Sequence, residues 1–152
     1  MNIIMTGSTS FVGAATVREL LRRGHTVTAI VRPKSSKLDT ILEGNEEALL
    51  SGRLLVTEND LSEPEKLLEK VTKPQEVFCH FGWGGSGSVS RTDKALQEKN
   101  MEISLETIRT AKALGCKKFL FSGSQAEYGM HQDLITENTV CEPKSLYGEA
   151  KL

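Results

Sequence analysis

Short apolar runs alternate with amphipathic segments along the whole chain. Five runs are apolar or β-branched and bounded by turn residues, which predicts strands at residues 2–5, 26–31, 53–57, 76–81 and 118–122. Three segments carry apolar side chains near helical spacing, which predicts helices at residues 11–23, 63–71 and 91–114. A short helix followed by a polar loop is expected within 34–52, and a last helix near residue 145.

Local signals mark several element boundaries. Gly24 follows the first helix, and Pro33 closes the second strand. Ser62 and Glu65 have the spacing of a capping box. Residues 82–90 hold four glycines and three serines, which predicts a loop.

Regular alternation of strands and helices predicts an α/β fold, a doubly wound parallel sheet with helices on both faces. The continuously apolar strands agree, because parallel strands are buried on both sides. The sequence shows no internal repeat, so residues 1–152 are expected to form one domain.

Composition narrows the class of partner. The chain has 19 Lys plus Arg and 20 Asp plus Glu, a net charge of −1, which argues against nucleic acid or a membrane surface as a partner. No apolar run approaches the roughly 20 residues that span a bilayer. The sequence shows neither a secretory signal pattern nor a disulfide or zinc spacing among Cys79, Cys116 and Cys141. A cytoplasmic location is therefore expected.

The first strand and helix are joined by a glycine-rich turn, which reads TGSTSFVG over residues 6–13. Glycines in this turn let backbone N–H groups approach a pyrophosphate at the positive end of the helix. An ordinary tight turn is the alternative, but the place of the motif in the first strand–helix connection favours dinucleotide binding.

Further motifs follow in order. Residues 80–83 read HFGW after the fourth strand, Asn100 lies in the long helix, residues 122–129 read SGSQAEYG, and residues 147–151 read YGEAK. Together with the glycine-rich turn, they resemble the extended short-chain dehydrogenase/reductase family, the nicotinamide-dependent epimerases and dehydratases. That family's turn reads T-G-x-x-G-F-x-G, with an aliphatic residue before the last glycine. Ser10 stands where the family has its middle glycine.

The resemblance implies a Rossmann-like fold and a bound NAD or NADP. The hydroxyl of Ser10 either donates a hydrogen bond to a phosphate or weakens binding by its bulk. Asp60 either contacts adenine or serves only helix entry, and Trp83 either stacks on the cofactor or packs in the core. The expected cofactor-binding positions are Gly7, Thr9, Ser10, Phe11, Val12, Gly13, Arg32, Asp60, Leu61, Phe81, Gly82, Trp83, Asn100, Tyr147 and Lys151.

Tyr147 and Lys151 are four residues apart and therefore share a helix face. A nearby ammonium favours an ionised phenol, which can exchange a proton with a substrate hydroxyl. The resemblance implies that Ser124 binds the same oxygen and that Lys151 also contacts the nicotinamide ribose. These three residues form the expected catalytic set; a solvated surface pair of Tyr and Lys is the alternative.

Two positions refine the expected chemistry. In the family's 4,6-dehydratases, acidic residues follow the serine, whereas this chain has Gln125 and Ala126, which disfavours water elimination. Arg32 ends the second strand, where an acidic residue would bind the 2′-hydroxyl of NAD. Arginine suits a 2′-phosphate, so NADP is favoured over NAD, with a solvated arginine as the alternative.

The expected function is hydride transfer by an NAD(P)-dependent epimerase or oxidoreductase, on a nucleotide sugar or a related hydroxyl or carbonyl compound. The alternatives are a non-catalytic NAD(P)-binding, redox-sensing module and a folded remnant without function. Members of the family continue well beyond the YGEAK motif. The chain is therefore expected to be an N-terminal fragment without the substrate-binding part, with a frayed last helix; the full-length form is expected as a homodimer.

Overall fold

The computed structural model describes residues 1–85, 87 and 89–152. The chain divides into two compact units: a sheet unit, Met1–Gly82 with Leu105–Phe121, and a second unit, Trp83–Ser104 with Ser122–Leu152. The expectation of one domain over residues 1–152 stays a prediction. The predicted loop at 82–90 includes residues 86 and 88, which lie outside the described residues.

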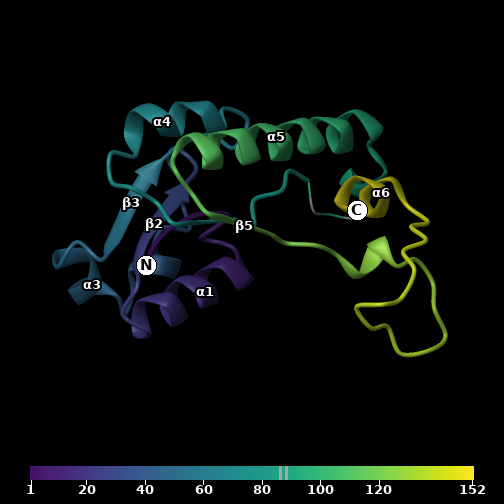
Figure 1. Cartoon of the computed structure of the whole chain (residues 1–152), viewed down its shortest axis with the longest axis horizontal. Coiled ribbons are helices and arrows are strands. Elements are labelled where there is room, and N and C mark those ends of the chain that lie inside the picture. Colours follow the sequence, from purple (N-terminus) through teal and green to yellow (C-terminus); the bar gives the residue numbers. More distant parts are fainter. Residues whose placement is uncertain (86, 88) are drawn as a thin grey trace. The chain divides into compact units, whose positions relative to one another are not determined.

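Five parallel strands form the sheet, in the order β3-β2-β1-β4-β5. Figure 1 labels β2, β3 and β5. The chain builds outward from β1 to β3 on one side and then returns to place β4 and β5 on the other. The order therefore reverses between β1 and β4, the point at which open α/β sheets bind ligands. The predicted doubly wound parallel sheet is confirmed, with strands at β1 (Asn2–Thr6), β2 (Thr26–Val31), β3 (Leu54–Glu58), β4 (Val77–His80) and β5 (Lys118–Phe121).

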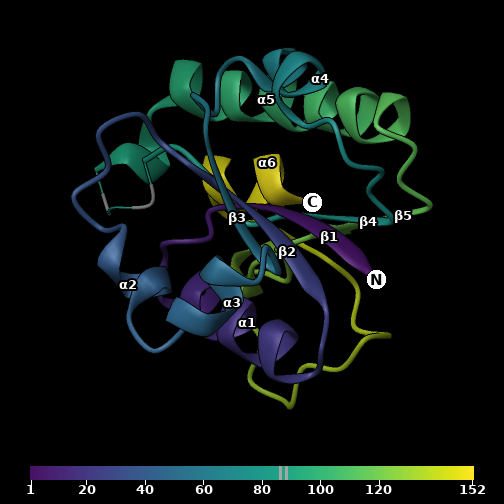
Figure 2. The ribbon, with the colours of Figure 1, turned by 90° about the vertical axis from the view of Figure 1, so that its left-hand side faces the viewer.

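Helices cover both faces of the sheet within the sheet unit (Figure 2). Alternate residues of β1 point to opposite faces: Ile3 and Met5 belong to one apolar cluster and Ile4 to the other. The first cluster includes Val17 from α1 (Phe11–Arg22), and the second includes Leu67 from α4 (Leu67–Lys70). The remaining helical elements are α2 (Asp39–Leu42), α3 (Glu46–Leu50), α5 (Lys94–Ala113), α6 (Leu146–Lys151) and the 3-10 turns η1 (Pro64–Lys66), η2 (Ser90–Thr92) and η3 (Gln125–Glu127).

Two local predictions are wrong. Helix α3 lies where a polar loop was expected. Ala48 is its one buried residue and its other residues are exposed, so the sequence shows no apolar periodicity there. Ser62 does not cap a helix: its hydroxyl donates to Asp60 Oδ1 over 2.7 Å. Glu63 instead precedes η1 without a side-chain cap.

Helix α5 begins three residues later than predicted. Asp93 Oδ1 accepts the N–H of Leu96 over 3.1 Å, which caps the helix at that point. The buried side of α5 is also more polar than expected, since Thr107 and Thr110 are buried whereas Ile108 is 45% exposed. In the described part of the chain, no helix has the length and apolar character needed to cross a membrane.

Candidate functional site

Two glycines hold the turn after β1 against the end of β4. Gly7 has a φ of +68°, and a Cβ there would lie 2.6–2.7 Å from the backbone of Phe81 and Gly82. A Cβ on Gly13 would collide with the carbonyl of Gly7. Packing alone therefore excludes a side chain at both positions. Four of the predicted cofactor positions, Gly7, Gly13, Phe81 and Gly82, lie together at the switch point of the sheet.

Ser10 caps α1. Its Oγ accepts the N–H of Gly13 over 3.1 Å, so the hydroxyl hydrogen remains available to a further acceptor. The N–H groups of Phe11 and Val12, in the first turn, have no intrahelical acceptor, and the helix dipole makes this end positive. The side chains of Phe11 and Val12 are 94% and 59% exposed. Together with half-buried Thr9, this end of the helix fits the pyrophosphate of a dinucleotide.

Buried hydrogen bonds connect the carboxyl ends of β1 and β4. Thr6 Oγ1 lies 2.9 Å from His80 Nδ1 and also accepts the N–H of Gly82 over 3.3 Å. Leu61 packs on the same point, because its Cδ1 would lie 2.8 Å from a Cβ on Gly82. Sequence reasoning did not single out Thr6 and His80 as site residues; their contacts fix the position of the turn.

Arg32 and Asp60 follow β2 and β3 at the carboxyl edge of the sheet, and both are exposed. Hydrogen bonds from the backbone N–H and hydroxyl of Ser62 lower the pKa of Asp60, and the positive charge of Arg32 adds a smaller lowering. The arginine therefore lies within electrostatic reach of the position predicted to contact adenine.

In the second unit, Tyr147 and Lys151 are buried on α6. They are 9% and 6% exposed, and Ser145 Oγ caps their helix by accepting the N–H of Gly148 over 3.0 Å. Lys151 Nζ donates to the carbonyl of Ser122 over 2.7 Å. The expectation of a frayed last helix stays a prediction. Burial lowers the pKa of Lys151 to about 8, although the negative charge of Glu127 opposes the shift.

The turn that carries Ser124 packs against α6. Ser124 Oγ accepts the N–H of Ala126 over 3.2 Å, and the Glu127 carboxylate accepts the N–H of Ser124, which makes a capping box. A Cβ on Gly148 would collide with the carbonyl of Ala126, so only glycine permits this approach. The glycine after the tyrosine is the sequence signal that could have predicted it.

Trp83 contacts the predicted catalytic pair. Its ring centroid lies 3.9 Å from Lys151 Nζ and 6.1 Å from the ring centroid of Tyr147, which it meets edge-on at 88°. Its indole N–H donates to Gln97 Oε1 over 3.1 Å, and Gln97 Nε2 donates to the carbonyl of Ser90 over 2.8 Å. Of the two alternatives for Trp83, the structure shows packing; stacking on a cofactor stays a prediction.

The side-chain oxygen and nitrogen of Asn100 both form hydrogen bonds with the backbone of Gly84. Its Oδ1 accepts the N–H of Gly84 over 3.0 Å, and its Nδ2 donates to the Gly84 carbonyl over 2.8 Å. It therefore fixes the segment that follows Trp83. Its membership of the cofactor-binding set stays a prediction.

Arg91 is a residue of this cluster that sequence reasoning missed. Its guanidinium carbon lies 4.7 Å from the ring centroid of Tyr147, and its side chain is exposed to solvent. No sequence spacing could show this contact, because η2 and α6 are more than fifty residues apart.

The predicted site residues thus form two groups, one in each unit. The sheet unit contains Gly7, Thr9, Ser10, Phe11, Val12, Gly13, Arg32, Asp60, Leu61, Phe81 and Gly82. The second unit contains Trp83, Asn100, Ser124, Tyr147 and Lys151.

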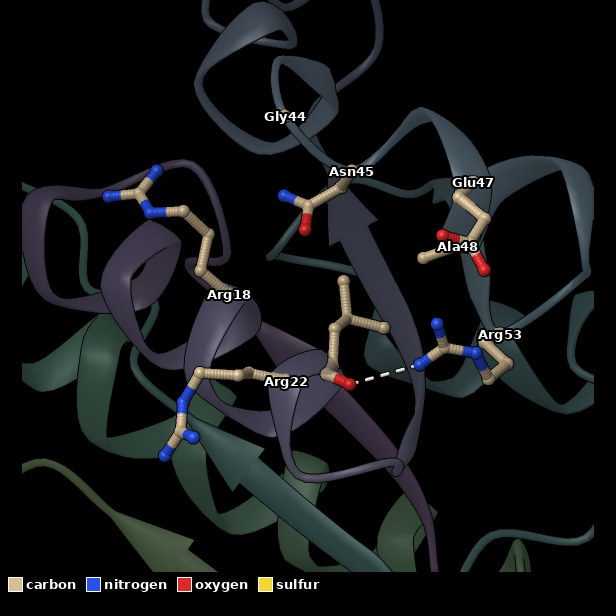
Figure 3. Close-up of a pocket in the computed structure, with 8 residues that line it drawn as sticks. Arg18, Arg22, Gly44, Asn45, Glu47, Ala48 and Arg53 are labelled. Carbon is tan, nitrogen blue, oxygen red and sulfur yellow. Dashed lines mark hydrogen bonds between the residues drawn. The ribbon is translucent and has the colours of Figure 1, made fainter.

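The sheet unit also has a separate hollow of about 340 Å³, lined by α1, α3, the connection between α2 and α3, and Arg53 just before β3 (Figure 3). Three arginines line it, but the side chains of Arg18 and Arg22 point away from Arg53. Arg53 donates to the Leu21 carbonyl over 2.9 Å, and Arg22 is paired with Glu19. The cations therefore do not converge on one ligand. Among the described residues, no group of three or more His, Cys, Asp or Glu could hold a metal ion.

Comparison with known families gives a match over almost the whole chain. The model of the NAD dependent epimerase/dehydratase family matches residues 3–152. Among curated relatives, a dTDP-6-deoxy-L-talose 4-dehydrogenase (NAD(+)) of Aggregatibacter actinomycetemcomitans is 31% identical, and the match covers 99% of this chain and 52% of the relative. A D-erythronate dehydrogenase of Cupriavidus necator is 29% identical, and the match covers 99% of this chain and 47% of the relative.

Solved structures give the same result. A UDP-glucose 4-epimerase of Thermotoga maritima, solved with UDP-glucose, has a TM-score of 0.78 and 26% identity, and the match covers 99% of this chain and 48% of that structure. The chain therefore spans about half the length of the relatives it matches.

Proposed function

Because the chain belongs to the NAD dependent epimerase/dehydratase family, we propose that its protein oxidises a secondary hydroxyl by hydride transfer to a nicotinamide cofactor, as a dehydrogenase or an epimerase. The observation that carries this proposal is the buried pair on α6. Tyr147 and Lys151 are 9% and 6% exposed, which a solvated surface pair would not be.

The glycine-rich turn is the proposed cofactor cradle. Gly7 and Gly13 leave room for close backbone approach, and the first-turn N–H groups of Phe11 and Val12 supply donors at the positive end of α1. The fit of these groups to a pyrophosphate supports NAD(P) as the ligand. When bound, the nicotinamide supplies the hydride acceptor.

The chain's own residues supply the proton chemistry. The phenolate of Tyr147 takes the proton of the substrate hydroxyl and becomes the neutral phenol, and the ammonium of Lys151 stabilises the negative charge of the phenolate before that transfer. The hydroxyl of Ser124 accepts from Ala126, so its own hydrogen can be donated to the substrate oxygen.

Elimination of water is disfavoured by the surroundings of Ser124. Neither Gln125 nor Ala126 is acidic, and the carboxylate of Glu127 already accepts the N–H of Ser124. The two dehydrogenase relatives, which act on a deoxysugar nucleotide and on D-erythronate by their names, support oxidation without elimination. We extend the substrate class to nucleotide sugars and related polyhydroxy compounds.

Cofactor choice and assembly complete the proposal. The exposed guanidinium of Arg32, near Asp60, supports NADP over NAD.

Met101, Leu105 and Ile108 on α5 are 44–55% exposed at helical spacing, which supports a homodimer. The three cysteines are unpaired with one another, which supports a reducing cytoplasmic location.

The test combines cofactor binding with turnover. Calorimetric titration with NAD⁺ and NADP⁺ measures binding. The absorbance of reduced nicotinamide measures oxidation of dTDP-6-deoxy-L-talose and D-erythronate, whereas epimerisation of UDP-glucose leaves no net reduced nicotinamide and is measured by separating the epimeric product. Tyr147→Phe is expected to keep cofactor affinity while turnover falls about 10² to 10⁴-fold. Full turnover in Tyr147→Phe contradicts the assigned role. Cofactor binding without turnover of any substrate supports the alternative of a non-catalytic binding module.

A further inference from the structure

A short backbone segment connects two of the proposed catalytic residues. Lys151 Nζ donates to the carbonyl of Ser122 over 2.7 Å. Two residues later, the N–H of Ser124 donates to the carboxylate of Glu127. We propose that Glu127 is a positioning residue of the reaction: its carboxylate fixes this segment, so that the hydroxyl of Ser124 and the ammonium of Lys151 are held in one arrangement. This inference rests on the proposed function of the pair on α6.

The Glu127 carboxylate lies against the backbone of this segment. The residue is half-buried, and its two carboxylate oxygens would lie 3.0 and 3.2 Å from a Cβ on Gly123. Gly123 is the residue between Ser122 and Ser124, so the carboxylate occupies the space that a side chain would take there. An ionised acceptor makes a stronger hydrogen bond to a backbone N–H than a neutral one does. Removal of the carboxylate is therefore expected to loosen the segment at Ser124.

The turn closed by Glu127 also directs the Ser124 hydroxyl. Ser124 Oγ accepts the N–H of Ala126 over 3.2 Å, which is the reciprocal half of the capping box. The Ala126 carbonyl approaches α6 so closely that a Cβ on Gly148 would collide with it. This approach and the hydrogen bond from Lys151 join the turn to α6. A change at Glu127 is therefore expected to affect both the serine hydroxyl and the lysine ammonium.

The charge of Glu127 acts in the same direction as its hydrogen bond. Burial lowers the pKa of Lys151, and the negative charge of Glu127 opposes that shift. Two other titratable or charged groups lie near: Tyr147, one turn away on α6, and Arg91 of η2, whose guanidinium carbon is 4.7 Å from the centroid of the Tyr147 ring. Tyr147 is negative only when its phenol is ionised, and Arg91 is positive. Glu127 therefore favours the charged form of Lys151, which the proposed function requires.

Two variants separate the hydrogen bond of Glu127 from its charge. Glu127→Gln keeps an acceptor for the N–H of Ser124 but has no charge, and Glu127→Ala has neither. Turnover is compared at about pH 6, below the pKa of Lys151 of about 8, on the substrate that the wild-type protein turns over fastest. We expect Glu127→Ala to lower kcat about tenfold or more, because small misplacements of catalytic groups are costly, and Glu127→Gln to keep most of the turnover.

The emission of Trp83 supplies a measurement that is independent of turnover. Its ring centroid lies 3.9 Å from Lys151 Nζ, so loss of the ammonium as pH rises should change the emission. We expect both Glu127 variants to lower the midpoint of this change by about half a pH unit or more, because removal of a nearby negative charge disfavours the ammonium. Glu149→Gln is the control, since Glu149 is an exposed acid of α6; its midpoint and turnover should match those of the wild type. Circular dichroism checks that each variant is folded.

The inference is overturned by unchanged turnover in Glu127→Ala, by equal losses of turnover in both Glu127 variants, or by an unshifted emission midpoint in Glu127→Gln. If Glu127→Ala does not fold, the midpoint in Glu127→Gln decides. Failure of the proposed function has a different signature: the midpoint shifts in Glu127→Gln, but Tyr147→Phe leaves turnover unchanged.

Discussion

The ammonium nitrogen of Lys151 lies 3.9 Å from the ring centroid of Trp83, the only tryptophan in the sequence. This cation–π contact and the hydrogen bond to the Ser122 carbonyl offset part of the cost of burying a charge. Burial nevertheless dominates and lowers the pKa of Lys151 to about 8. The protonation of a predicted catalytic residue is thereby coupled to a side chain that can be observed directly.

Intrinsic fluorescence is expected to report this protonation. As pH rises through about 8, Lys151 loses its charge and the cation–π contact with Trp83 disappears, so the emission of Trp83 should change with a midpoint near that pH. Lys151→Met should remove the transition. Lys99→Met, at an exposed lysine paired with Glu102, should leave it intact; a transition that persists in Lys151→Met contradicts the assignment.

Stability should rise with pH over the same range. The pKa of Lys151 is lowered from 10.5 to about 8 in the folded chain, so between these values the unfolded chain binds more protons. The free energy of unfolding therefore increases from pH 8 toward 10.5, by up to about 3 kcal/mol at about 1.4 kcal/mol per pKa unit. Urea denaturation at several pH values measures the increase, and Lys151→Met should lack it. A parallel pH dependence in both proteins would refute the prediction.

Gly148→Ala should separate α6 from the Ser124 turn. The added Cβ would collide with the Ala126 carbonyl, so the helix must shift, at an expected cost of about 1 to 3 kcal/mol. The pH-dependent emission of Trp83 should weaken in the same variant. Gly87→Ala is the control, because a Cβ there meets nothing within 4 Å. Unchanged stability and emission in Gly148→Ala would show that the two segments do not need this close approach.

Ser10 variants separate capping from cofactor contact. Ser10→Ala removes the acceptor for Gly13 N–H and should cost about 1 kcal/mol of stability, whereas Ser10→Gly should cost a few tenths. Cofactor affinity in Ser10→Gly is expected to be unchanged or higher, because close backbone approach is kept. A loss of about 1 kcal/mol or more in binding by both variants would show instead that the hydroxyl contacts a phosphate.

Arg32 should decide between the two cofactors. Arg32→Ser is expected to weaken NADP⁺ binding about tenfold or more, because an ionic hydrogen bond to a 2′-phosphate is worth about 1.5–3 kcal/mol, while NAD⁺ binding stays nearly constant. Lys66→Ser provides the control, since Lys66 also acts on Asp60 but is paired with Glu63. Equal effects of Arg32→Ser on both cofactors would remove the NADP preference.

The three central strands β1, β2 and β4 were predictable because a strand buried on both faces leaves a continuous apolar run in the sequence, whereas β3 and β5 lie at the edges of the sheet and are largely half-buried or exposed. Observed strands begin or end within two residues of the predicted ones. Helix α3 was missed because Ala48 is its single buried residue, which leaves no periodic pattern. The buried side of α5 was predicted wrongly at Ile108. The apolar pattern places Ile108 on the buried side, whereas the structure exposes it and buries polar residues such as Thr107 instead.

The candidate site was predictable only where motifs carry it. Resemblance to a family supplied Tyr147 and Lys151 by their spacing on one helix. The contacts of Trp83 and Arg91 with them arise between segments more than fifty residues apart in the sequence. Local spacing holds no information on such contacts, because they depend on how α6 packs in the folded chain.

The crowding around Gly7 changes how mutational data on this chain should be interpreted. Position 7 requires glycine for two reasons. A Cβ there would collide with the backbone of Phe81 and Gly82, and the φ of +68° disfavours any other residue. A survey of all substitutions would find this position intolerant even in an assay of abundance alone, with no ligand present. Loss of the protein on substitution of Gly7 is thus uninformative about function. If substitutions of exposed Phe11 instead keep the abundance of the protein but remove its activity, that result would indicate a ligand at this position.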